Sequence, residues 1–156
     1  MILYFVRHGI AEEGAGIDDS ERKLTKEGVE AMRIGAKAMK DLRIKPARIY
    51  SSPRVRARQT AGIIADALGV QVEVRDEVNV NFDLQAVESL IAGLGEADDV
   101  MFVGHEPSIS DTLGELTGGR VIMKKGGLAR VDVDSRTPLR GALVWLIAPK
   151  IFKAAE

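Results

Sequence analysis

The chain has 156 residues, of which 46% are hydrophobic, and this length predicts a single domain spanning residues 1–156. Its 22 Lys and Arg residues nearly balance 23 Asp and Glu residues, so no overall field would draw it to nucleic acid or to an anionic membrane. Cysteine is absent, which excludes disulfides, thiolate catalysis and cysteine metal sites. The first apolar run is too short for a signal peptide, so we expect a cytoplasmic protein; the composition leaves its oligomeric state open.

That apolar run, Ile2–Val6, stops at Arg7, His8 and Gly9. Its length and its charged boundary are typical of a strand that is buried on both faces. In open α/β sheets ligands bind beyond the carboxyl ends of the strands, so we expect Arg7 and His8 at a site. Gly9 leaves room for a ligand to approach the backbone. A structural histidine would also fit this short motif.

The next stretch, Glu12–Lys23, is polar and aperiodic, which predicts a loop long enough to lie over the site. Arg22 within it is either half of a surface ion pair or a further anion contact. Thr25 is the predicted N-cap of a helix that ends near Leu42. A second short strand then begins at Arg48.

Three arginines follow the second strand. We predict Ser52 as the N-cap and Pro53 as the first residue of a helix that carries Arg54, Arg56 and Arg58 in its opening turns. Cations there oppose the helix dipole, whereas a bound anion would explain them. Helical spacing places Arg56 beside the apolar stripe, so we predict that Arg56 enters the site and that the other two stay solvated or at its rim.

After a predicted strand over 70–74 and a predicted helix over 84–94, the opening pattern returns. Val100–Val103 is a short apolar run that is followed by Gly104, His105, Glu106 and Pro107. Both histidines of the chain therefore follow a buried strand beside glycine, and Pro107 begins a helix whose amino terminus faces the same edge. This paired context favours a shared site.

The rest of the chain predicts two further strands, over 128–133 and 142–147. Lys124–Gly127 lacks the spacing of a phosphate-binding P-loop, and we interpret it as a hairpin connection. Trp145 lies in an apolar run and is expected in the core.

A neutral imidazole is a nucleophile toward phosphorus, and planar guanidinium groups suit the oxygens of a tetrahedral anion. Phosphoryl transfer therefore fits these residues better than acyl transfer, for which no activated Ser or Cys is evident. Two histidines with a carboxylate could bind zinc, but no closely spaced ligand pair occurs and the arginines would repel a dication. We expect no metal.

Three motifs in this order resemble the histidine phosphatase superfamily. They are Arg7-His8-Gly9, the stretch Ser51–Ala61, and the stretch Val103–Pro107. Within the superfamily, the short length and the stretch Asp19–Thr25 resemble the SixA-type phosphohistidine phosphatases. The resemblance spans nearly the whole chain. It implies a phosphoglycerate mutase-like α/β fold, a three-layer αβα sandwich with a mostly parallel central sheet.

The same resemblance implies a set of roles. His8 would attack phosphorus and become transiently phosphorylated, while Arg7, Arg56 and His105 would hold the phosphoryl oxygens and Arg22 would assist. Water would then hydrolyse the phosphoenzyme, with no metal or organic cofactor.

The chain also departs from part of the superfamily. Ile10–Gly14 stands where the phosphoglycerate mutases carry Glu or Gln, Ser and Asn, which disfavours mutase activity. Glu77, beside Asp76, is the candidate general acid.

We expect hydrolysis of phosphohistidine on a signalling protein. The alternatives are a phosphatase for a small metabolite or nucleotide, and a phosphate- or phosphoprotein-binding module without turnover.

Overall fold

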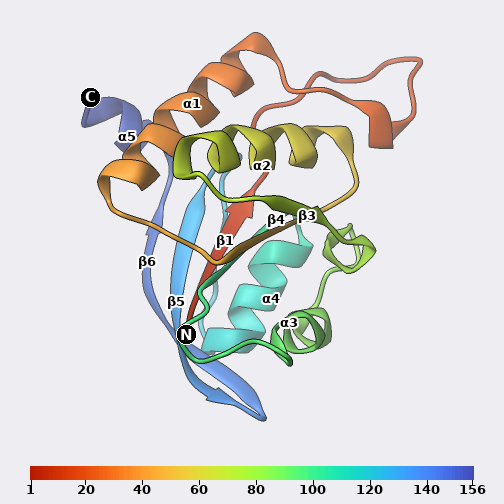
Figure 1. Ribbon diagram of the computed structural model, residues 1–156. Coiled ribbons are helices and arrows are strands. Elements are labelled where there is room, and N and C mark those ends of the chain that lie inside the picture. The colour runs from red at the N-terminus through yellow and green to blue at the C-terminus, as the bar shows by residue number, and fades with distance from the viewer.

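A six-stranded mixed sheet forms the centre of the molecule, and helices cover both of its faces (Figure 1). The computed structural model describes residues 1–156. Its strands are β1 (Ile2–Arg7), β2 (Arg48–Ser51), β3 (Val72–Val74), β4 (Val100–Gly104), β5 (Leu128–Arg136) and β6 (Leu139–Ile147). Its helices are α1 (Lys26–Asp41), α2 (Val55–Leu68), α3 (Leu84–Ile91), α4 (Ser108–Thr117) and α5 (Pro149–Ala154). Two 3₁₀ turns, η1 (Asp19–Glu21) and η2 (Asp76–Val78), lie in the loops.

The strand order is β3-β2-β4-β1-β5-β6. The pairs β1–β4, β2–β4 and β2–β3 are parallel, whereas β5 and β6 run antiparallel to their neighbours. This confirms the predicted αβα sandwich with a mostly parallel sheet. Because parallel strands end at the same edge, the residues that follow β1, β2 and β4 meet there.

Strand β1 lies at the centre and is buried on both faces, as its continuous apolar sequence predicts. Leu3 and Phe5 face one core, in which Phe5 stacks on Phe102 with ring centroids 5.4 Å apart. Helices α3 and α4 close this core. Tyr4 and Val6 face the other core, which α1, α2 and α5 close. The sheet is thereby held from both sides, and its carboxyl-terminal edge is a rigid support for a site.

The predicted helices begin and end close to the expected residues. Thr25 caps α1, since its hydroxyl oxygen accepts a hydrogen bond from Gly28 N at 2.9 Å. Gly69 ends α2 with a φ of 70°, a left-handed conformation that favours glycine. The predicted N-cap of α2 is wrong, because Arg54 occupies that position and Ser52 lies before the helix.

The segment Lys124–Gly127 is not a hairpin connection. It joins α4 to β5, and Gly126 N donates to the carbonyl oxygens of Arg7 and His8, each at 3.0 Å. The hairpin instead joins β5 to β6, and both strands are longer than their apolar stretches indicate. The periodicity missed the ends nearest the hairpin because they are mostly polar, although the first residue of β6, Leu139, is buried in the core.

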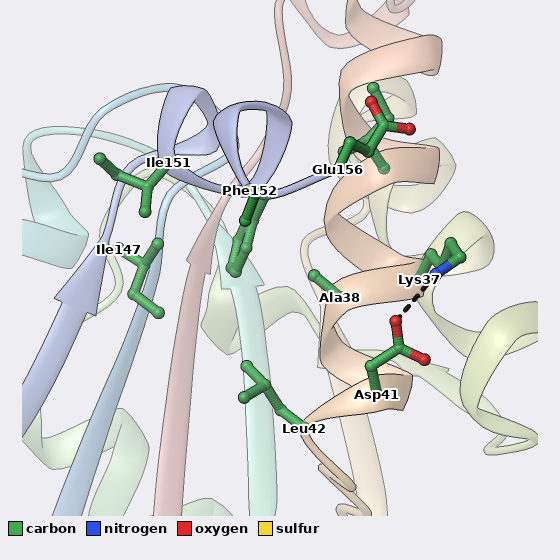
Figure 2. A pocket seen from close by; sticks show the side chains of 10 residues that line it. Lys37, Ala38, Asp41, Leu42, Ile147, Ile151, Phe152 and Glu156 are labelled. Atoms are coloured by element: carbon green, nitrogen blue, oxygen red, sulfur yellow. Dashed lines mark hydrogen bonds and ion pairs between the residues drawn. The ribbon is translucent and has the colours of Figure 1, made fainter.

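Helix α5 has no counterpart among the predicted elements. Its Phe152 is 7% exposed and packs beside α1, where a Cβ on Gly35 would lie 3.7 Å from the ring. Figure 2 shows Phe152 between α5 and α1, at a mostly apolar hollow of about 320 Å³. Lys37 and Asp41 form an ion pair of 2.8 Å at its side. The candidate site residues do not line this hollow.

No helix in the structure is both long enough and apolar enough to cross a bilayer.

Candidate active site

The pairing of β1 with β4 brings the two histidines together. Arg7 lies opposite Gly104 in the register, and His8 N donates to Gly104 O at 3.0 Å. His105 is the first residue after β4, and the centroid of its ring lies 5.2 Å from that of the His8 ring. The two histidines, each beside a glycine after a buried strand, therefore meet because of the register in which β1 pairs with β4.

A cavity of about 190 Å³ opens at this edge of the sheet. Its lining includes the predicted residues Arg7, His8, Arg22, Arg56 and His105. Four residues that the sequence analysis did not assign complete the lining: Ala11, Val80, Glu106 and Lys125.

His8 is 7% exposed, and two contacts define its protonation state. Its Nδ1 lies 2.7 Å from Gly9 O, and since a carbonyl oxygen can only accept, Nδ1 carries the proton. Arg56 Nε donates to His8 Nε2 at 3.3 Å, so Nε2 presents a lone pair. Burial lowers the pKa of His8 to about 4, and the charges of Arg56 and Arg7 add to this effect. His8 is therefore a neutral imidazole at pH 7, as nucleophilic attack requires.

Gly9 packs against α1 and α2 and so helps to position His8. A Cβ at Gly9 would lie 2.9 Å from Met32 Cγ, which leaves no room for a side chain. Gly9 N donates to Thr60 Oγ1 at 3.0 Å, and Thr60 is bound in turn to Arg56 O at 2.8 Å. Gly9 does not line the cavity, so its close approach is to α1 and not to a ligand.

Arg56 is 4% exposed and confirms the placement predicted from helical spacing, whereas Arg58 is exposed on another side of α2. The Arg56 guanidinium donates to Asp19 O at 2.7 Å and to Asp19 Oδ2 at 3.0 Å. Arg54 also donates to Asp19 Oδ2, and Arg22 Nε donates to Asp19 Oδ1 at 2.9 Å. Asp19 thus joins three arginines. Arg22 is ion-paired, as one interpretation expected, and it also lines the cavity, where its contact with an anion stays a prediction.

Arg7 is fixed by the loop that precedes β5. Its Nη1 donates to Met123 O at 3.0 Å, while its Nε is buried without a hydrogen-bond partner. Burial lowers the pKa of Arg7, and the Glu106 carboxylate opposes that shift. A donor that is buried but unpaired beside an anion-sized cavity is a group that a bound oxyanion can satisfy.

His105 is 2% exposed, and its Nε2 lies 2.7 Å from Ser52 Oγ. Its Nδ1 is buried and unpaired. Burial, with smaller contributions from the neighbouring His8 and Arg56, lowers the pKa of His105 to about 3. Ser52 was expected to cap a helix, but its hydroxyl instead orients the second histidine and accepts from Arg54 N at 3.2 Å.

Glu77 does not reach the cavity. Its carboxylate accepts from Arg75 at 3.2 Å, and its side chain is 43% exposed. The turn η2 buries Val78 and leaves Glu77 in solvent, and Val80 is the residue of this loop that lines the cavity. The expected proximity of Glu77 to the substrate site is wrong for this structure. The cavity's carboxylate is Glu106.

Two neutral imidazoles and three guanidinium groups around a small cavity suit a tetrahedral oxyanion. No cluster of three or more His, Asp or Glu side chains is placed to hold a metal ion. The chemistry that these groups can perform is nucleophilic attack on a bound phosphoryl group.

Comparison with known proteins agrees with this chemistry. The family described as "Histidine phosphatase superfamily (branch 1)" matches residues 3–82. Phosphohistidine phosphatase SixA of Escherichia coli (strain K12) is 27% identical, over 100% of this chain and 99% of its own. An uncharacterized protein of Picosynechococcus sp. is 33% identical over 82% of each chain.

A solved structure of the protein histidine phosphatase SixA, complexed with tungstate, superposes on this one with a TM-score of 0.87. The two chains are 27% identical, and the match covers 97% of this chain and 99% of the other. The chain therefore belongs to the histidine phosphatase superfamily, and it is a phosphatase.

Proposed function

We propose that this phosphatase hydrolyses phosphohistidine on a signalling protein, by way of a phosphoryl group carried on His8. The observation that carries this proposal is the size of the cavity. Pockets that enclose a whole small molecule usually measure roughly 300–1,000 Å³. At about 190 Å³ this cavity has room for a phosphoryl group and little more, so the rest of the substrate lies outside it, as a protein would. The full-length similarity to SixA supports the same substrate class.

In the first step, the lone pair on His8 Nε2 attacks phosphorus. Arg56 Nε now donates to that lone pair, so substrate binding exchanges this hydrogen bond for one to a phosphoryl oxygen. Arg7 Nε and His105 Nδ1, which are buried and unpaired, take further oxygens. Arg22 contributes charge from the cavity wall. The bond between phosphorus and the substrate nitrogen breaks, and its electron pair stays on that nitrogen; the ring leaves as a neutral imidazole when its other nitrogen carries a proton.

In the second step, water attacks phosphorus and the bond to His8 Nε2 breaks. The electron pair returns to Nε2, and because Nδ1 keeps its proton toward Gly9 O, His8 becomes the neutral imidazole again. The proposal needs no metal or organic cofactor, since each developing charge lies beside a guanidinium or imidazole group.

The test is a comparison of substrates in the presence of a chelator. Purified protein is given a phosphohistidine-bearing phosphotransfer domain and, separately, sugar phosphates and nucleotides. We expect a higher kcat/KM on the protein substrate, and we expect His8→Ala to abolish release from every substrate. Faster hydrolysis of a small phosphomonoester would replace the proposed substrate with a metabolite.

A further inference from the structure

The hydrolytic step needs a group that takes a proton from water, and Glu106 is the one carboxylate that lines the cavity. It immediately follows His105 at the carboxyl end of β4, so the strand that delivers one imidazole also delivers this carboxylate. The cavity's other polar lining residues are His8, His105 and cations.

The Glu106 side chain is held in place by α4. Ser110 N donates to Glu106 Oε1 at 2.8 Å, and Ser110 Oγ donates to Glu106 Oε2 at 2.5 Å. Ser110 is 9% exposed, and its Oγ accepts from Met123 N at 3.0 Å. Since Met123 O accepts from Arg7, one chain of hydrogen bonds fixes both the Glu106 carboxylate and a phosphoryl-binding guanidinium.

The other acidic groups near this edge are engaged elsewhere. Asp19 is bound to Arg22, Arg54 and Arg56. Glu77 is exposed and paired with Arg75, outside the cavity. His105 is a poor proton acceptor, because burial lowers its pKa to about 3 and its Nε2 already has Ser52 as a partner.

We infer that Glu106 is the catalytic base for hydrolysis of the phosphoenzyme, an assignment that rests on the proposed function. The oxygen of water bonds to phosphorus while one of its protons passes to the Glu106 carboxylate. The bond from phosphorus to His8 Nε2 breaks, and its electron pair stays on Nε2. Phosphate, neutral His8 and protonated Glu106 result, and Glu106 then loses its proton to solvent.

This role predicts that the two chemical steps respond differently to Glu106→Gln. The amide keeps the size of the side chain and still accepts from Ser110, but it cannot take a proton. With an aryl phosphate that has a good leaving group, attack by His8 needs no proton transfer. We therefore expect a rapid burst of about one phenolate per enzyme, followed by turnover that is about 100-fold slower than in the wild type. Phosphorylated His8 should accumulate during the slow phase.

Glu77→Gln is the matched control, because that carboxylate is exposed and outside the cavity, and it should leave both phases unchanged. An unslowed steady state in Glu106→Gln would overturn the assignment, and so would a burst that slows as much as turnover. Glu106→Ala supplies a second arm: added formate, a small carboxylate, should accelerate decay of its phosphoenzyme, and a decay that formate leaves unchanged contradicts the base role. If wild-type protein never forms phosphorylated His8, the proposed function itself fails, and that result is distinct from an unslowed variant.

Discussion

At the scale of single residues, the defining feature is that both imidazoles are buried and neutral. Burial lowers the pKa of His8 to about 4 and that of His105 to about 3, both well below the value of about 6.5 for a histidine in the unfolded chain. A neutral His8 keeps a lone pair on Nε2 across the physiological range, and Arg56 is its present hydrogen-bond donor. The same shifts make the folded state sensitive to acid, because only the unfolded chain takes up these two protons readily.

The first prediction concerns stability and pH. Well above pH 6.5 the histidines are neutral in both the folded and the unfolded state, so the lowered pKa values do not change the free energy of unfolding. Below pH 6.5 the unfolded state takes up protons and is stabilised, until the pH reaches the folded-state pKa values. Between pH 7 and pH 5 each histidine should therefore lower the free energy of unfolding by about 2 kcal/mol. Urea denaturation in phosphate-free buffer measures this loss. His8→Asn should lose about 2 kcal/mol less than the wild type over the same interval, and an identical loss would contradict the burial argument.

The second prediction separates two arginines of α2. Arg56 is 4% exposed and contacts His8, whereas Arg58 is exposed. Arg56→Ala should lower kcat/KM on an aryl phosphate by about 100-fold or more, the usual cost of one well-placed donor to a charged transition state. Arg58→Ala is the control and should retain wild-type activity. Equal effects would refute the assignment made from helical spacing.

At the scale of elements, the strands and long helices were predictable, and the loops between them were not. His8, His105 and Arg56 could be placed because strand ends and helix faces follow from local periodicity. Ser52 and Glu106 also follow strand ends, those of β2 and β4, although the sequence analysis assigned neither of them a role at the site. Asp19 and Lys125, in contrast, lie at the site because of the paths that loops take across the sheet edge. Those paths depend on contacts between distant residues, such as Gly126 N with Arg7 O, which no local pattern encodes.

Glu77 shows that local sequence context can also predict a site residue that the structure leaves outside the cavity. Its position in a loop after β3 made it a reasonable acid, and its carboxylate carries the right chemistry. The turn η2 decides which of its side chains is buried, and it buries Val78. Ser52 was likewise assigned to helix capping from its sequence context, although its hydroxyl contacts a histidine 53 positions away.

The third prediction belongs to the turn η1. Asp19 accepts hydrogen bonds from Arg22, Arg54 and Arg56, so its carboxylate orients the arginine cluster. Asp19→Asn should lower kcat/KM by roughly tenfold, since charge-assisted bonds are about twice as strong as neutral ones. Asp18→Asn is the neighbouring control, because Asp18 is exposed and bonds to Ser20. If both variants lose the same activity, the turn acts through its fold and not through the Asp19 contacts.

At the scale of the whole molecule, the cores on the two faces of the sheet support the site edge, and α5 completes one of them. Phe152 is 7% exposed beside α1, whereas Ile151, one position earlier, is 54% exposed (Figure 2). Phe152→Ala should lower the free energy of unfolding by about 3 kcal/mol, and Ile151→Ala should change it little. Denaturant unfolding checks both. Activity per folded molecule should stay at the wild-type value in both variants, because neither residue lines the active-site cavity.

The proposed mechanism depends on one covalent event, the transfer of a phosphoryl group to His8. The most direct test is to quench the protein with substrate on the millisecond scale and to map the acid-labile phosphoryl group by mass spectrometry under alkaline conditions. We predict a transient mass gain confined to the peptide that contains His8, absent from His8→Asn and formed before phosphate appears. Phosphate release without any phosphorylated His8, or with the label on His105, would contradict this mechanism.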